Sequence, residues 1–437
     1  MSRYVRGWKG SAVCGAVLLA GLALAGCGGD SGGSSGQSST SSTPLSGVTS
    51  PPPAVAQAKA ENTPVDPALV VADNSFGLSL LQTLIQGSPN TNIAISPTSV
   101  AMALQIAYNG AAGSTQTAMA QTLQLGSLSL SQLNDDNAAL LAALQSPDPV
   151  VNLTVANSLW VRLGANTVSP TFSNTDQTYY GAEVGDLAGA PANVNAWGNT
   201  ETNGLIAQIL PPDTNLSQAV AILANVVYFK GAWTEAFDPS QTTAALFTLA
   251  DGTQTSVDMM SQPNTNTLPV LFGTNFTAFS LPYGQGRLSM IVVLPNTGVD
   301  FGTFIGTLTP TEIASWAGQM VTGSLINLYL PRFKTSFSQP LPNALSALGM
   351  GIAFEPGVAD FSGIYPLAYL SAVQHDTVVE VDEAGTVAAG STTIVIGTTA
   401  VQKPVDVDAN HPFFYAIRDS QTGALLFTGI MMNPNAG

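Results

Sequence analysis

The sequence predicts an α+β fold that forms one large domain. Helical patterns cluster in the first half of the globular part and strand patterns in the second half, which is the segregated arrangement typical of this class. Of the 437 residues, 45% are hydrophobic and 9% are charged, so the chain can bury a large core. At roughly 150 residues per domain the length allows up to about three domains, but the order of the patterns favours one.

Residues 1–26 have the composition of a secretory signal peptide. Three basic residues lie in the first ten positions, and 12–25 is almost wholly apolar. That apolar run is too short for a permanent membrane helix. The segment 24–27 resembles a bacterial lipoprotein box, which implies that Cys27 is lipidated and becomes the first mature residue. The alternative is an ordinary cleavage site followed by an accidental cysteine.

A lipidated Cys27 would tether the protein to a membrane, because acyl chains contribute about 0.8 kcal/mol per buried methylene. Gly28, rather than Asp, follows the cysteine. In a cell with two membranes this favours the outer one, so we expect an exported lipoprotein at the outer membrane or cell surface, on its extracellular or periplasmic side. Residues 27–66 are rich in Gly, Ser, Thr and Pro and are interpreted as a flexible tether. The folded domain is assigned to 67–437.

Charge and the scarcity of Cys and His exclude several function classes. The chain has 11 Lys and Arg against 27 Asp and Glu, a net charge of −16. This opposes nucleic-acid binding and a basic membrane-surface helix. The only cysteines are Cys14 and Cys27, and the only histidines are His375 and His411. A disulfide scaffold, a Cys-rich zinc site and a thiol-redox enzyme are therefore not expected, and neither is a cofactor.

Helix signals begin the globular part. An apolar stripe at helical spacing predicts a helix from 68 to about 85. A short strand follows at 93–95. Ser96 then precedes a proline, so a capped helix begins there and runs to about Tyr108, where Asn-Gly stops it. A third helix fits 114–122.

Strand patterns dominate the rest of the globular part, as β-branched and apolar runs between turn residues. They occur at Val150–Val161, Ala219–Phe229, Phe276–Leu281, Leu288–Leu294, Leu325–Phe333, Ala372–Val381, Phe413–Ile417 and Leu425–Met431.

Serine motifs that resemble hydrolase nucleophile loops occur in the tether, at 29–33 and 32–36. Both motifs need a base histidine within hydrogen-bond reach and a rigid turn between strand and helix. Neither condition is met in this coreless segment, so we expect no catalytic role for them.

Seven short motifs occur in a fixed order along the globular part. They are Asn92–Ser99, Asn109–Gly113, Asn225–Trp233, Leu330–Phe333, Val381–Thr386, His411–Phe413 and Leu426–Gly429. In this order and at this spacing they resemble the serpins, a family of serine protease inhibitors, from about Ala68 to Pro434. The resemblance implies a serpin fold with three β-sheets, eight to nine helices and an exposed reactive-centre loop.

An uncharged segment separates Glu383 from Lys403. Its nineteen residues include no proline, with small side chains first and β-prone ones later. Such a segment can slide between two paired strands and donate every backbone N–H to the ladder. In serpins this segment is the protease cleavage site. The protease attacks it and forms an acyl-enzyme, and it is displaced as the cleaved strand inserts into the central sheet. From the residues alone, a long flexible surface loop is the alternative.

The resemblance also locates the reactive bond and the hinge. The family spacing from Glu383 places the bond between Thr399 and Ala400, or up to two residues later because the following segment is about two residues longer than in common members. Small uncharged residues here favour the shallow pocket of an elastase-like or subtilisin-like protease over a trypsin-like one. The implied hinge residues are Glu383, Gly385, Thr386, Ala388, Ala389 and Gly390.

Mechanical roles are implied for residues outside the loop. The hydrogen-bonded shutter comprises Ser96, Ser99, Asn225 and His375. Trp233 matches the breach beneath the start of the loop, and Arg332 pairs with Glu383 at the hinge. The residues alone also allow a satisfied core histidine, a Ser/His catalytic pair, a plain core tryptophan, and two solvated charges that contribute about 0–1 kcal/mol.

We therefore expect a non-enzymatic, monomeric inhibitor that forms a covalent acyl complex with an extracellular serine protease. The alternative is a non-inhibitory serpin that acts as a binding or structural module. Such members often have charged, proline-rich or bulky hinge residues, and this hinge has none.

Overall fold

The computed structural model describes residues 64–145, 147–163, 167–386 and 403–436. Within them the α+β prediction is correct: helices α2–α10 and three β-sheets are present. The helices are α2 (Pro67–Gly87), α3 (Pro97–Gly110), α4 (Gly113–Thr122), α5 (Leu130–Leu144), α6 (Pro170–Tyr180), α7 (Ala192–Glu201), α8 (Phe301–Gly306), α9 (Pro310–Gln319) and α10 (Pro342–Leu345).

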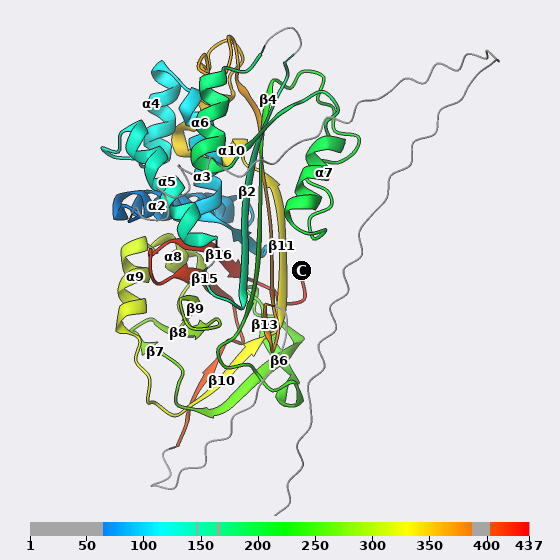
Figure 1. The fold of residues 1–437 in the computed structure, drawn as a ribbon. Coiled ribbons are helices and arrows are strands. Elements are labelled where there is room, and N and C mark those ends of the chain that lie inside the picture. Colours follow the sequence, from blue (N-terminus) through cyan, green and yellow to red (C-terminus); the bar gives the residue numbers. More distant parts are fainter. Residues whose placement is uncertain (1–63, 146, 164–166, 387–402, 437) are drawn as a thin grey trace, which may run out of the picture. The chain divides into compact units, whose positions relative to one another are not determined.

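The main sheet contains the strands that carry several of the predicted shutter and hinge residues. Its strand order is β11-β12-β4-β2-β3, with β13 paired to β4. The strands are β2 (Val151–Val161), β3 (Glu183–Asp186), β4 (Ala221–Ala232), β11 (Phe333–Pro340), β12 (Leu370–Val381) and β13 (Gly385–Thr386). Helix α7 covers one face, while α3 and the other N-terminal helices lie on the opposite face (Figure 1).

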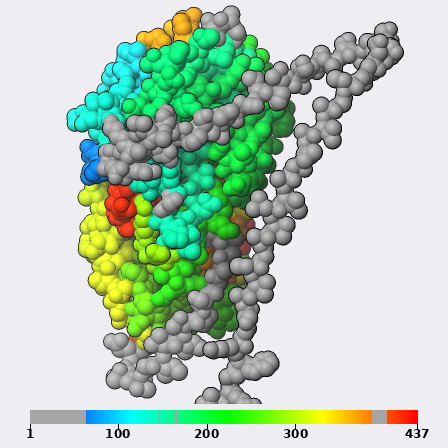
Figure 2. Space-filling model, in the orientation of Figure 1, coloured from blue at the N-terminus to red at the C-terminus, as the bar shows by residue number. Residues whose placement is uncertain are grey.

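Two further sheets complete the β-structure of the described residues. One, in spatial order, comprises β1 (Ile93–Ile95), β16 (Leu425–Met431), β15 (Phe413–Asp419), β9 (Leu288–Pro295), β8 (Phe276–Pro282) and β7 (Val270–Phe272). The other comprises β14 (Val405–Asp408), β10 (Ile326–Pro331), β6 (Gln254–Thr265) and β5 (Thr243–Thr248). Where it is not covered by grey atoms, the face drawn in Figure 2 is closely packed with side chains.

Helix α3 begins as its cap signal predicts. The Ser96 side chain accepts a hydrogen bond from the Ser99 N–H, and a proline occupies the first helical position. The helix continues two residues beyond Tyr108, to Gly110. A β-carbon on Gly110 would lie 2.3 Å from Ile364, so the absent side chain permits close packing here. This helix therefore presents its capped N-terminus to the main sheet.

The strand expected at 325–333 is present as β10, but it ends before Phe333, where the chain enters a different sheet. Strand β10 ends at Pro331, β11 begins at Phe333, and Arg332 lies between them. The Arg332 N–H donates to the Asp258 carbonyl at 2.8 Å. Alternate positions are buried in both strands, so the side-chain pattern alone does not show the change of sheet.

Helix α2 is long and apolar enough to cross a membrane, and it is the one helix of the described residues that meets this test. In the structure, 61% of its most apolar window is buried within the protein. Phe76, Leu80 and Leu81 belong to the main hydrophobic core and are fully buried. The apolar character of α2 is therefore explained by core packing.

Candidate functional site

Strands β4 and β12 form the seam of the main sheet. They run parallel and are directly paired from Ala221 with Leu370 to Tyr228 with Val378. His375 is opposite Asn225 in this register. No other described strand lies between them along this length, so the sheet is closed at the seam.

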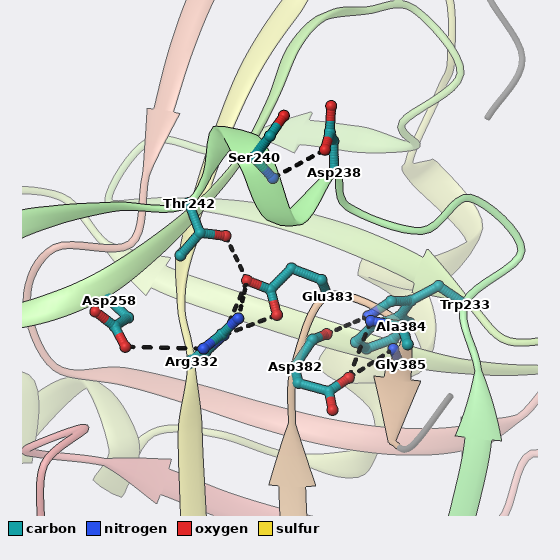
Figure 3. Close-up of polar contacts among 10 residues, drawn as sticks. All are labelled: Trp233, Asp238, Ser240, Thr242, Asp258, Arg332, Asp382, Glu383, Ala384 and Gly385. Atoms are coloured by element: carbon teal, nitrogen blue, oxygen red, sulfur yellow. Dashed lines mark hydrogen bonds and ion pairs between the residues drawn. The ribbon is translucent and has the colours of Figure 1, made fainter. Parts of the chain in front are cut away.

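The chain reverses direction immediately after β12. Asp382 makes an isolated bridge with Gly385, and β13 then runs antiparallel to the end of β4, with Thr386 opposite Gly231. The Asp382 side chain accepts hydrogen bonds from the Ala384 and Gly385 N–H groups at 2.9 and 3.2 Å (Figure 3). The predicted hinge therefore starts as a tight, ordered turn whose outgoing strand already pairs with β4.

Gly385 occupies a position that only glycine accommodates. Its φ is +132°, and a β-carbon would lie 2.3 Å from the Gly231 carbonyl oxygen and 2.7 Å from the Ala232 α-carbon. Backbone atoms cannot move aside as a flexible side chain would. The close approach of the hinge to β4 thus depends on this residue.

Arg332 and Glu383 form the ion pair that the sequence predicts. The Arg332 Nε lies 2.8 and 2.7 Å from the two Glu383 carboxylate oxygens, and a terminal nitrogen lies 2.6 Å from one of them. Thr242 donates a further hydrogen bond to the same carboxylate (Figure 3). The Glu383 side chain is only 6% exposed and is bonded to Arg332, so the pair is not two separately solvated charges.

Electrostatics at Glu383 favour the ionised carboxylate. Burial acts to raise its pKa, but hydrogen bonds from Arg332 and Thr242 outweigh burial, and the pKa lies below its ordinary value. The Glu383 hydrogen bond likewise raises the pKa of Arg332. The pair therefore remains charged at neutral pH and fixes the C-terminal end of β12 to the start of β11.

Trp233 lies directly against the hinge turn. Its backbone N–H donates to the Ala384 carbonyl and its indole N–H donates to the Asp382 carbonyl, both at 3.0 Å. The indole stacks on Tyr283 with ring centroids 4.4 Å apart. Trp233 is thus both a core residue and the residue that holds the turn in place.

The four predicted shutter residues form one buried hydrogen-bonded cluster. The Ser96 backbone N–H donates to His375 Nε2 at 3.1 Å, and His375 Nδ1 lies 2.7 Å from Asn225 Oδ1. The Asn225 amide nitrogen donates to the Ser99 hydroxyl. Nε2 accepts a hydrogen bond and so has no proton; the network therefore assigns the proton to Nδ1, which donates to Asn225.

Burial keeps the His375 imidazole neutral. It lowers the pKa of His375 to about 3, and the side chain is fully buried. Among the described residues no serine hydroxyl is hydrogen-bonded to this ring; Ser96 reaches it only through its backbone N–H. The geometry therefore fits a satisfied core histidine that closes the seam and does not support a Ser/His catalytic pair.

Asn157 on β2 also belongs to this cluster, although the sequence analysis did not predict it. Its side-chain oxygen accepts a hydrogen bond from the Asn225 amide nitrogen at 2.6 Å. With Ser99 accepting the other amide hydrogen, Asn225 is fixed with its oxygen toward His375. The sequence signal that was available is an Asn inside the strand pattern at 150–161.

Several predicted site residues lie outside the described residues. They are Cys27, Ala388, Ala389, Gly390, Thr399 and Ala400. The described residues include no group of three or more His, Cys, Asp or Glu side chains that could hold a metal ion. The site is thus a closed sheet seam with an ordered hinge turn.

Comparison with known proteins identifies the family. The family model described as serpin (serine protease inhibitor) matches residues 71–434. The chain belongs to the serpin family. Serpin B6 of Pongo abelii is 33% identical over 377 residues, which cover 84% of this chain and 99% of that relative.

Microbial serpins and solved structures agree with this assignment. An uncharacterized serpin-like protein of Thermococcus kodakarensis is 34% identical and covers 84% of this chain and 86% of its own length. The native-state crystal structure of the thermophilic serpin tengpin has a TM-score of 0.75 at 28% identity, covering 83% of this chain and 94% of that one. The solved structures confirm the expected serpin fold. Members of the family are mostly protease inhibitors rather than catalysts.

Proposed function

We propose that this serpin traps serine proteases through cleavage of the segment between Glu383 and Lys403 and its insertion between β4 and β12. The observation that supports this most directly is the hinge turn. It reverses the chain at Asp382–Gly385 and sets β13 antiparallel on β4. Continuation of β13 along β4 would carry the cleaved segment into the seam between two parallel strands.

Insertion exchanges one pairing for two. The β4–β12 ladder over Leu370–Val378 would be replaced by antiparallel ladders on both sides of the new strand. The shutter opposes this exchange, because the His375–Asn225 bond crosses the same seam. In this proposal the intact sheet is less stable than the sheet with the inserted strand, and the shutter slows the conversion between them. A protein that inhibits by strand insertion requires this kinetic barrier.

The target class follows from the loop residues. We place the reactive bond at Thr399–Ala400, within about two residues, in an uncharged stretch of the sequence. A buried carboxylate in a trypsin-like pocket would lack a partner there, whereas a shallow apolar pocket accepts small side chains. Elastase-like or subtilisin-like serine proteases are the proposed targets, bound as covalent acyl complexes by a monomer.

The proposal is tested by incubating the detergent-solubilised protein with elastase, subtilisin and trypsin, followed by denaturing gels and mass spectrometry. We expect a covalent band with the first two enzymes and a released peptide that begins at or within two residues of Ala400. The variant Thr386→Arg should be cleaved without accumulating complex, because a guanidinium forced between strands is desolvated.

The proposal is wrong if wild type is cleaved at this position yet forms no complex and gains no heat resistance. A non-inhibitory serpin that acts as a binding or structural module would then be the better interpretation. Peptides that begin before Ile396 would refute the placed bond, since too little strand would remain to displace the protease.

We also propose that the protein is an exported bacterial lipoprotein tethered at the outer membrane or cell surface. The support is the basic, apolar and small-residue order of 1–26 followed by Cys27. The variant Cys27→Ser should move from the membrane fraction to the soluble fractions. A variant that still sediments with membranes would contradict the lipid anchor.

A further inference from the structure

A buried polar cluster lies between helices α2, α3, α5 and α6, apart from the sheet seam. Its members are Asp73, Gln105, Asn109, Asn134, Asn137, Asp176 and Tyr180. They are linked mainly by side-chain amides: Asn109 and Asn134 exchange two hydrogen bonds, and Tyr180 donates to Asn134 at 2.7 Å. The proposed inhibitory mechanism uses none of these groups.

Asp73 and Gln105 form a fully buried contact within the cluster. Gln105 Nε2 donates to Asp73 Oδ1 at 2.8 Å, and the two side chains are 0–1% exposed. The remaining oxygen of each group, Asp73 Oδ2 and Gln105 Oε1, is buried without a hydrogen-bond partner. If Asp73 were ionised, both orphan atoms would be acceptors, and each would lack a donor.

No described cation compensates a charge at Asp73. The ion pairs of the described residues involve Arg287, Arg332 and Lys334, and none includes this carboxyl. The groups that face it are Gln105 from α3 and, from α6, Tyr180, whose own pKa is raised by burial, by Asp176 and further by Asp73. Burial without a compensating cation disfavours an ionised carboxylate relative to the neutral acid.

We infer that Asp73 is a neutral carboxylic acid in the folded protein, whose Oδ2–H donates to Gln105 Oε1 and closes a cyclic acid–amide pair between α2 and α3. One proton satisfies both orphan oxygens at once, because it turns Oδ2 from an acceptor into a donor. The direction of the Asp73 pKa agrees: burial raises it well above its ordinary value, against the lowering effect of Gln105.

The proton on Asp73 completes the link between α2 and α3, and α3 is the helix that carries two of the shutter residues. Gln105 belongs to α3, whose N-terminal turn contains Ser96 and Ser99. The folded state keeps the Asp73 proton that the unfolded chain loses above about pH 4. Stability from this group is therefore greatest in acid and declines as pH rises toward the folded pKa, by up to about tenfold in the unfolding constant per pH unit.

The variant Asp73→Asn tests the inference, because its amide supplies the same donor without a titrating proton. Infrared difference spectra at pH 6, wild type minus variant, should contain a protonated-carboxyl band. Between pH 4 and 6, the plot of the logarithm of the unfolding constant against pH should have a slope about one unit smaller in the variant than in wild type. That difference corresponds to the one proton that Asp73 keeps in the folded state. Asp176 and Tyr180 remain in both proteins, so their contributions cancel. Asp213→Asn, at an exposed carboxyl, is the matched control and should change neither measurement.

A difference spectrum without a protonated-carboxyl band, or an unchanged slope in Asp73→Asn, would overturn the assignment. Gln105→Met provides a second readout that does not depend on Asp73 being replaced. Methionine has a similar volume but lacks the amide nitrogen and oxygen that contact Asp73. The carboxyl band should therefore persist at pH 6 but shift to the frequency of an acid without a hydrogen bond. An unshifted band would show that Gln105 does not accept the proton.

Discussion

The hinge ion pair offers a sharp test of how burial sets the strength of a charge contact. Arg332→Ala removes a guanidinium that makes three contacts of 2.6–2.8 Å with Glu383, whose side chain is 6% exposed. A second pair lies nearby: Lys334 on β11 lies 3.3 Å from Glu380 on β12, with both side chains about half exposed. Lys334→Ala is therefore a matched control.

The two substitutions should differ severalfold in their effect on the free energy of unfolding. Removing one partner of a fully buried pair costs about 3–5 kcal/mol. Arg332 is itself 43% exposed and Thr242 continues to donate to Glu383, so we expect about 2 kcal/mol, or roughly 30-fold in the unfolding constant. The exposed control pair should cost about 0.3 kcal/mol.

Urea denaturation at pH 7 measures both losses, with the midpoint converted through an unchanged m-value. The titration of Glu383 adds a second signature. Its pKa is depressed in the folded state, so the stabilisation is present above the unfolded value near 4.3 and is lost as pH falls through the folded pKa. The gap between wild type and Arg332→Ala should therefore close toward pH 3. Equal losses in the two variants, or a gap independent of pH, would refute the role assigned to burial.

Three further outcomes are expected. Gly385→Ala should abolish the β13–β4 pairing and lower covalent-complex yield, because its β-carbon would collide with Gly231; unchanged amide-exchange protection of the hinge would contradict this. Burial raises the pKa of Asp376 to about 6, so stability should fall as pH rises from about 4 to 6, and Asp376→Asn should remove that part of the urea-midpoint slope. Trp233→Phe keeps the stacked ring but loses the indole bond to Asp382, and should cost about 1 kcal/mol by the same urea assay; no loss would show that the bond is idle.

Local signals in the sequence identified much of the scaffold. The cap at Ser96 correctly placed the start of α3, and the apolar runs of β1 and β16 have the predicted bounds. These signals work because helix capping and side-chain alternation depend on residues only a few positions apart. Helix α5 could have been found in the same way, since Ser129 and Gln132 form a capping box.

Family motifs, rather than periodicity, identified the shutter and the hinge pair. The structure brings those residues together as predicted, with His375 beside Asn225 and Arg332 beside Glu383. The hinge beyond Thr386 and the reactive bond stay predictions from the sequence.

Tertiary structure alone decided which polar groups are buried and what they contact. The change of sheet between β10 and β11, the part of Asn157 in the shutter, and the Asp73–Gln105 pair all depend on segments brought together by folding. A sequence specifies which side chains are available, but desolvation and hydrogen-bond satisfaction are properties of the packed environment. The same carboxylate is therefore a solvated charge, an ion-pair partner or a neutral acid, according to the neighbours that the fold provides.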